Sequence, residues 1–165
     1  MEIQMWQIIA LTILSMILIW DSLSTAIFDG KPMFAGILAG IIMGDITTGL
    51  AVGATLQLMV LGVGTYGGSS MPDYLTGAIV GTVFAVTSGQ GVEFGIGLAV
   101  PVGLLMVNLD VLARFCNVFF AKRVEAAIDR MDYKAIARNT WLGMVPWGLS
   151  RALPVFIMLI FGEDI

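Results

Sequence analysis

The sequence predicts an all-α membrane protein, a polytopic helical bundle with broken or re-entrant helices interrupted by glycine. Two observations predict this fold class. Hydrophobic residues fill 58% of the 165 positions and charged residues only 12%, which is about half the charged share of soluble domains. So few charges would leave a soluble protein with large exposed apolar patches. The chain also holds 20 glycines, of which 17 lie between residues 30 and 103.

The first expected element is a spanning helix over residues 3–20. This apolar run carries only four polar side chains and is long enough for a tilted span. A cleaved signal peptide would begin with a basic region, whereas the only charge before this run is that of Glu2. We therefore expect a retained helix.

The next two apolar segments, residues 33–63 and 77–109, are each interrupted by a polar, glycine-containing stretch. The first break covers residues 44–49, and neither half beside it reaches the ~20 residues that a spanning helix needs. The second break covers residues 87–95. Paired glycine-interrupted segments are typical of the broken helices that form transporter binding sites. Ordinary loops between short or tilted spans are the alternative that the sequence leaves open.

Glycines recur every fourth residue within these two segments. Examples are Gly36-x-x-x-Gly40 and Gly77-x-x-x-Gly81, which a shift of 41 residues superposes. Small residues at this spacing share one helical face, so that two helices can approach closely inside a membrane. We expect dense helix packing there.

Basic residues gather in residues 114–138, which carry a net charge of +3 while the rest of the chain carries −7. Because Lys and Arg beside membrane segments mark the cytoplasmic side, we expect residues 112–139 to form an amphipathic helix that leaves the membrane as a cytoplasmic arm. The arm is a candidate docking face for a soluble partner, and a solvated helical face is the simpler alternative. Nucleic acid is an unsuitable partner, since acids are interleaved with the bases.

The last apolar run, residues 141–161, predicts a further span. It contains Pro146, Pro154 and a single charge, that of Arg151. A charge at this depth is costly unless it is paired or reaches the surface. Of these two interpretations, pairing with an acid is the preferred one.

Counts of reactive residues exclude much catalytic chemistry. The chain has no histidine, so it offers no imidazole as general base, zinc ligand or phosphoryl carrier. The single cysteine, Cys116, has no second cysteine with which to form an internal disulfide. Gly44-Asp45 lacks the first glycine of the intramembrane aspartyl protease motif, because Ile42 stands there. We expect no enzyme activity, no cofactor and no metal site.

Isolated polar residues in apolar surroundings are candidate functional residues, because unpaired charges in a membrane cost several kcal/mol. Hydroxyl, amide and carboxylate groups are also the groups that recognise sugar hydroxyls. Asp73 follows Pro72, so a helix N-cap is as good an interpretation there as ligand contact. The candidates are Asp45, Thr47, Thr48, Thr55, Gln57, Asp73, Glu93, Asn108, Asp110 and Arg151.

The polar breaks resemble a known family. Residues 44–57 read GDITTGLAVGATLQ, with LG at residues 61–62 and MPD at residues 71–73. This order resembles the IIC membrane subunit of mannose/sorbose-type sugar phosphotransferase systems, which shows G-D-x-x-T-G-x-x-x-G-x-T-L, then L-G, then P-D. RALP at residues 151–154 is similar to the later R-x-x-P segment of that family. Gln57 is a departure, because relatives such as the mannose permease have an acid there.

The resemblance implies a single IIC-type transmembrane domain over residues 1–165. Family members usually continue through further membrane segments, so the chain resembles the N-terminal part of one. A IIC subunit pairs with a IID membrane subunit, and soluble IIA and IIB proteins relay phosphate through histidines from phosphoenolpyruvate to the incoming sugar. The family expectation is a homo-oligomer of hetero-complexes in the bacterial inner membrane.

For this chain, the resemblance implies a permease component that translocates a hexose or an amino sugar. The arm at residues 114–138 would then contact IIB or IID. The implied sugar-site residues are Asp45, Thr48, Thr55, Gln57 and Asp73. The alternative function is that of a secondary carrier or channel, with ion coupling through Asp45 or Glu93.

Overall fold

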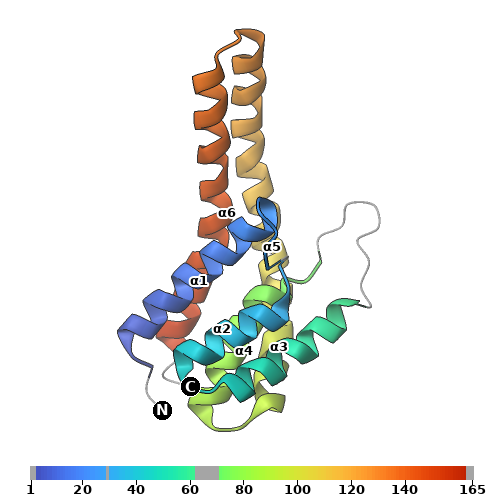
Figure 1. Ribbon diagram of the computed structural model, residues 1–165, viewed down its shortest axis with the longest axis vertical. Helices are drawn as coiled ribbons and strands as arrows, with labels where there is room; N and C mark the ends of the chain where they lie inside the picture. Colours follow the sequence, from blue (N-terminus) through green and yellow to red (C-terminus); the bar gives the residue numbers. More distant parts are fainter. Residues whose placement is uncertain (1–2, 29, 62–70, 163–165) are drawn as a thin grey trace.

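The computed structural model describes residues 3–28, 30–61 and 71–162, which fold into six α-helices and no strand. In Figure 1 the first four helices gather at one end of the molecule, and the last two project from it as a long hairpin. Within the described residues, three helices (α1, α5 and α6) are long and apolar enough to cross a membrane. The predicted all-helical membrane fold is confirmed. The helices are α1 (Met5–Leu23), α2 (Pro32–Met43), α3 (Ile46–Leu61), α4 (Tyr74–Ser88), α5 (Val92–Asp129) and α6 (Tyr133–Phe161).

The first glycine-interrupted segment folds as a hairpin of two short helices, α2 and α3. Helix α2 ends at Gly44, whose φ of +84° lies in the left-handed region that favours glycine. Asp45 then caps α3, because its carboxylate accepts hydrogen bonds from the Thr48 amide (3.0 Å) and hydroxyl (2.5 Å). Because of this cap, α3 begins at Ile46, directly after Asp45. The break therefore covers only residues 44–45, and the prediction of residues 44–49 was too long.

The second segment is also less interrupted than predicted. Helix α4 continues to Ser88, and α5 begins at Val92 and runs unbroken through Pro101 to Asp129. Only residues 89–91 lie between the two helices. Gly89 and Gly91 have φ values of +66° and +88°, so these two glycines supply the conformations that the turn needs.

Facing glycines bring α2 against α3 and α4 against α5, as their spacing predicted. Gly36 of α2 and Gly49 of α3 lie so close that a Cβ on either residue would overlap the carbonyl oxygen of the other. Gly81 of α4 and Gly95 of α5 have the same relation, and a Cβ on Gly81 would lie 2.5 Å from the Gly95 oxygen. The helix backbones therefore touch directly, which is the dense packing that small residues permit in a membrane.

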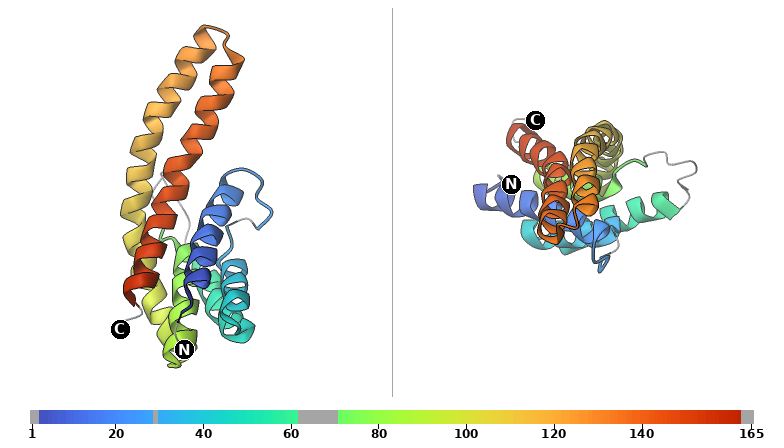
Figure 2. Two further views of the ribbon diagram at one scale, coloured as in Figure 1. Left: turned by 90° about the vertical axis from the view of Figure 1, so that its left-hand side faces the viewer. Right: turned by 90° about the horizontal axis from the view of Figure 1, so that it is seen from above.

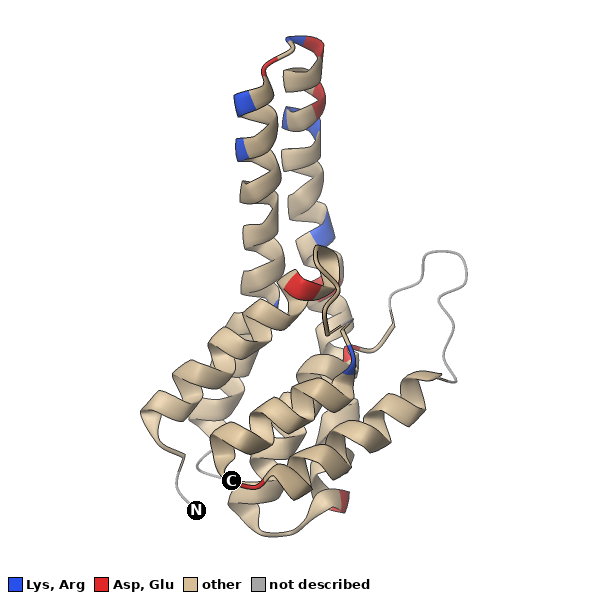
Figure 3. Cartoon of the chain, viewed as in Figure 1, with Lys and Arg blue, Asp and Glu red and all other residues tan. Residues whose placement is uncertain are grey.

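The predicted arm at residues 112–139 is a helical hairpin rather than one helix. It consists of the end of α5 and the start of α6, joined at residues 130–132, and Asp132 caps α6 by accepting from the Ala135 amide (3.1 Å). Figure 2 shows the hairpin standing clear of the other helices. Charged residues are concentrated at its far end (Figure 3), as expected of an arm outside the apolar layer.

Helix α1 lies against α6, the second helix of this long hairpin, and against α2. The Trp20 indole donates to the Met144 carbonyl oxygen of α6 (2.9 Å), and the Gln7 amide donates to the Ile42 carbonyl oxygen of α2 (3.0 Å). The core lies among the apolar helices, with fully buried side chains that include Leu11, Leu56, Ile79, Met106 and Val155.

Candidate functional site

The five predicted sugar-site residues lie at separate positions on two helices. Asp45 and Thr48 stand at the start of α3, Thr55 and Gln57 lie further along it, and Asp73 stands at the start of α4. Asp45 and Gln57 are about 18 Å apart along the α3 axis, at 1.5 Å of rise per residue. The five side chains therefore do not form one cluster in this structure, and their sugar contacts stay a prediction.

Three of the α3 side chains are engaged in local hydrogen bonds. Asp45 and Thr48 bond to each other in the N-cap. The Thr55 hydroxyl donates to the Ala51 carbonyl oxygen one turn earlier (2.8 Å), which leaves its oxygen lone pairs free to accept. These groups stabilise the helix and keep part of their capacity to bind a ligand.

Gln57 differs from the other candidates. Its Oε1 atom is buried and has no hydrogen-bond partner within the described part of the chain. Leaving a buried amide oxygen without a donor costs about 1–3 kcal/mol, so native proteins rarely keep one without a reason. A sugar hydroxyl is a suitable donor for this oxygen. Gln57 is therefore the candidate whose geometry most favours ligand contact.

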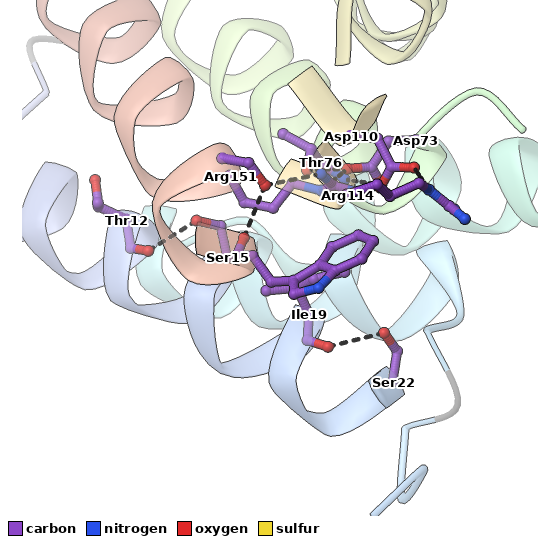
Figure 4. A network of polar contacts seen from close by, with 11 residues as sticks. Thr12, Ser15, Ile19, Ser22, Asp73, Thr76, Asp110, Arg114 and Arg151 are labelled. Carbon is purple, nitrogen blue, oxygen red and sulfur yellow. Dashed lines mark hydrogen bonds and ion pairs between the residues drawn. The ribbon is translucent and has the colours of Figure 1, made fainter. Parts of the chain in front are cut away.

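A charged network joins the start of α4 to α5 and α6 (Figure 4). Arg151 of α6 is buried, and its Nη2 donates to Oδ1 of Asp110 on α5 (3.0 Å). Its Nε lies 2.5 Å from Asp73 Oδ2, as an ion pair without a well-directed hydrogen bond. The second oxygen of Asp110 accepts from Arg114 Nε (2.8 Å). The predicted pairing of Arg151 with an acid is confirmed, and it involves two acids.

Asp73 is both an N-cap and an ion-pair partner. Its carboxylate accepts from the Thr76 amide (3.3 Å) and hydroxyl (2.7 Å), and its own amide donates to the Gly103 carbonyl oxygen (3.0 Å). The N-cap interpretation is confirmed, and a ligand role for Asp73 stays a prediction. Nothing in the sequence showed which acids Arg151 would meet, because the partners come from different helices.

Other ligand sites receive less support. No group of three or more His, Cys, Asp or Glu side chains that could hold a metal ion occurs in residues 3–28, 30–61 and 71–162. Glu93, the second candidate for ion coupling, is exposed in the first turn of α5. Three surface hollows of about 690, 680 and 850 Å³ are lined by none of the five candidate residues.

Comparison with known proteins agrees with the resemblance. A family model described as "PTS system sorbose-specific iic component" matches residues 5–165. The sorbose-specific EIIC component of Klebsiella pneumoniae is 30% identical over 161 residues, which are 98% of this chain and 60% of that protein. The mannose-specific EIIC component of Escherichia coli (strain K12) is 30% identical over 160 residues, which are 97% and 60% of the two chains.

A solved structure shows the same fold. A cryo-EM structure of the mannose transporter ManYZ with microcin E492 superposes with a TM-score of 0.88 at 28% identity, covering 97% of this chain and 64% of the matched chain. The chain spans about 60% of the length of the sorbose and mannose relatives. Because the family model covers nearly the whole chain, this protein belongs to the family of sorbose-specific IIC components of the sugar phosphotransferase system.

Proposed function

We propose that this chain works as the permease component, IIC, of a phosphoenolpyruvate-dependent sugar phosphotransferase system. It binds a hexose or an amino sugar and moves it across the bacterial inner membrane while partner subunits phosphorylate it. The family match over residues 5–165 carries the proposal. The three membrane-length helices support it, as do relatives named for sorbose and mannose.

The proposal assigns phosphoryl transfer to partner chains. None of the 165 residues is a histidine, so the phosphoryl-carrying histidines would belong to the soluble IIA and IIB proteins. A IID subunit would share the membrane with this chain, in a homo-oligomer of hetero-complexes. Large apolar side chains exposed on α5 and α6, among them Leu105, Trp141 and Phe161, suit contact with lipid or with such membrane partners.

Within the permease, α3 is the proposed sugar-binding helix. Gln57 carries a buried oxygen that lacks a donor, and Thr55 and Thr48 retain acceptor capacity on the same helix. Sugar hydroxyls can both donate and accept, so they match amide, hydroxyl and carboxylate groups. Asp45 and Asp73 complete the proposed set.

Gln57→Met tests this site, because methionine keeps the length of the side chain and removes the amide. In vesicles containing the complete transporter, we expect the KM for sugar uptake to rise about tenfold, as for the loss of one buried hydrogen bond. Thermal stability should stay the same or rise, since an unpaired buried oxygen is removed. Gln90→Met, in the exposed turn after α4, is the matched control. An unchanged KM for Gln57→Met would exclude Gln57 from the sugar site.

The driving force tests the function itself. Uptake that requires phosphoenolpyruvate and releases a phosphorylated sugar is the expected result. Uptake of unmodified sugar, driven by a sodium or proton gradient, would instead identify an ion-coupled carrier. Asp45→Asn and Glu93→Gln would then show which of the two acids couples the ion.

A further inference from the structure

The charged network lies where the arm meets the helical bundle, is mostly buried, and contains equal numbers of positive and negative groups. It contains two carboxylates and two guanidinium groups, from Asp73, Asp110, Arg114 and Arg151. The side chains of Arg151, Asp110 and Asp73 are only 5%, 10% and 11% exposed, whereas that of Arg114 is 56% exposed. One end of the network therefore lies inside the helical bundle, and the other end reaches the surface of the arm.

Burial makes each member depend on the others. Charges removed from water are costly, and removing one partner of a buried ion pair leaves the other charge uncompensated. Arg151 is the central member, because its guanidinium group contacts Asp73 at the start of α4 and Asp110 on α5 at the same time. The planar fork of arginine can hold two carboxylates in this way, and the single ammonium of lysine is a poorer substitute.

A backbone contact adds to this attachment of α4. The Asp73 amide donates to the Gly103 carbonyl oxygen of α5. A Cβ on Gly103 would lie 3.2 Å from the Asp73 carbonyl oxygen, so the small residue allows this close approach. The first turn of α4 is thus fastened to α5 by its backbone and to α6 by an ion pair.

The outer end of the network lies in the arm. Asp110 shares its two oxygens between Arg151 inside the bundle and Arg114 at the start of the basic stretch. The Arg114 guanidinium group lies 5.5 Å from the centre of the Trp147 ring of α6, a distance at which cation–π attraction operates. A continuous series of contacts therefore runs from the cap of α4 to the arm.

We propose that Arg151 is a positioning residue for transport. By holding Asp73 and Asp110 together, it keeps the first turn of α4 in a set position relative to the arm. Helix α3, which carries most of the sugar-site candidates, packs against α4. It is thereby held relative to α5 and α6, the helices that extend to the proposed phosphorylating partner. This role rests on the proposed function, in which α3 binds sugar and the arm meets the soluble partner.

The double variant Asp73→Asn/Arg151→Met tests the proposal without leaving a new unpaired charge. Asparagine retains the N-cap, and Asp110 keeps its bond to Arg114. In the complete transporter in lipid nanodiscs, we expect amide exchange in residues 71–80 to quicken about tenfold, because the first turn of α4 opens more easily. Sugar phosphorylation per folded transporter should fall about tenfold, because α4 is then no longer held against α5 and α6.

Two further variants separate positioning from a general loss of stability. Asp132→Asn/Lys134→Met removes two charges at the exposed end of the arm, far from α4, and should leave amide exchange in residues 71–80 unchanged. Arg151→Lys leaves the proposed sugar-site residue Asp73 unchanged, keeps the positive charge and loses the fork. It should lower turnover by less than the double variant does, with the KM for sugar within about twofold of the wild-type value.

Amide exchange and sugar phosphorylation test the positioning role and the proposed function separately. Unchanged exchange in residues 71–80 of the double variant would overturn the positioning role, and so would faster exchange with full turnover. If the wild-type transporter phosphorylates no sugar, the proposed function fails, and the exchange comparison still decides whether Arg151 fastens α4.

Discussion

The hairpins α2–α3 and α5–α6 are held together by opposite means. In the short hairpin the two backbones touch through Gly36, Gly40 and Gly49. In the long hairpin side chains make the contacts: Arg151 reaches Asp110 across the pair of helices, and charges cover its far end (Figure 3).

The difference follows from the surroundings of each hairpin. Lipid chains are as apolar as leucine, so helices inside a membrane associate through close packing or through polar contacts rather than by escaping water. The short hairpin depends on close packing, and its contact positions Gly36, Gly40 and Gly49 leave no space for a side chain. The far end of the long hairpin is charged and exposed to water (Figure 3), so it tolerates varied side chains. Substitutions should therefore have opposite consequences in the two hairpins.

The largest effect is expected at the glycine contacts. In Gly49→Ala the new methyl group would lie 2.8 Å from the Gly40 Cα, so the helices must separate, and we expect a loss of about 2–3 kcal/mol. Gly97→Ala is the control on α5, where a Cβ meets no atom within 4 Å in the described part of the chain. It should add up to about 1 kcal/mol, because alanine favours helix. Thermal unfolding in detergent measures both, and equal stabilities would contradict direct backbone contact.

A smaller effect is expected from the two acidic caps, Asp73 and Asp132. Each caps a helix through a backbone amide three residues ahead, and asparagine is an equally good cap. Asp73→Asn should still cost about 2 kcal/mol, because the buried Arg151 loses a partner. Asp132→Asn, in an exposed turn, should cost less than about 0.5 kcal/mol. Chemical denaturation of both variants measures the difference, and equal losses would show that the buried pair adds nothing to the cap.

The smallest effects are expected at the two hairpin turns, each of which contains a left-handed residue. The short hairpin turns at Gly44 with φ +84°, and the long hairpin turns at Met131 with φ +53°. Met131→Gly should stabilise by about 0.5–1 kcal/mol, since a side chain is disfavoured there. Gly44→Ala should destabilise by about 1 kcal/mol for the same reason. Paired melting curves test this, and a loss of stability in Met131→Gly would show that the Met131 side chain contributes contacts that outweigh the strain.

Much of the fold could be predicted from local patterns. Hydrophobic runs and glycine spacing indicated the spans and the close helix contacts, because both patterns act within a few turns of one helix. The lengths of the two breaks were overestimated. Polar residues such as Thr48 looked like loop residues, although the cap of Asp45 places them inside a helix. The arm was expected as one helix, because the turn at Met131 has no glycine to mark it.

The candidate site was predicted only as a set of residue types. Asp45, Thr48, Thr55, Gln57 and Asp73 were equal candidates in the sequence. The structure distinguishes Gln57 by its buried oxygen without a partner, and Asp73 by its ion pair. Burial and pairing depend on neighbours from other helices, so no pattern within one segment could show them.

The amino-acid sequence by itself determined that this is a glycine-rich helical membrane protein of the IIC type, because composition, periodicity and an ordered motif are properties of the chain alone. Only the tertiary structure decided which groups meet. Arg151 pairs with Asp110, 41 residues away, and with Asp73 on a third helix. The physical reason is that the cost of a buried charge demands partners, whereas the packing of distant helices decides which partners are within reach.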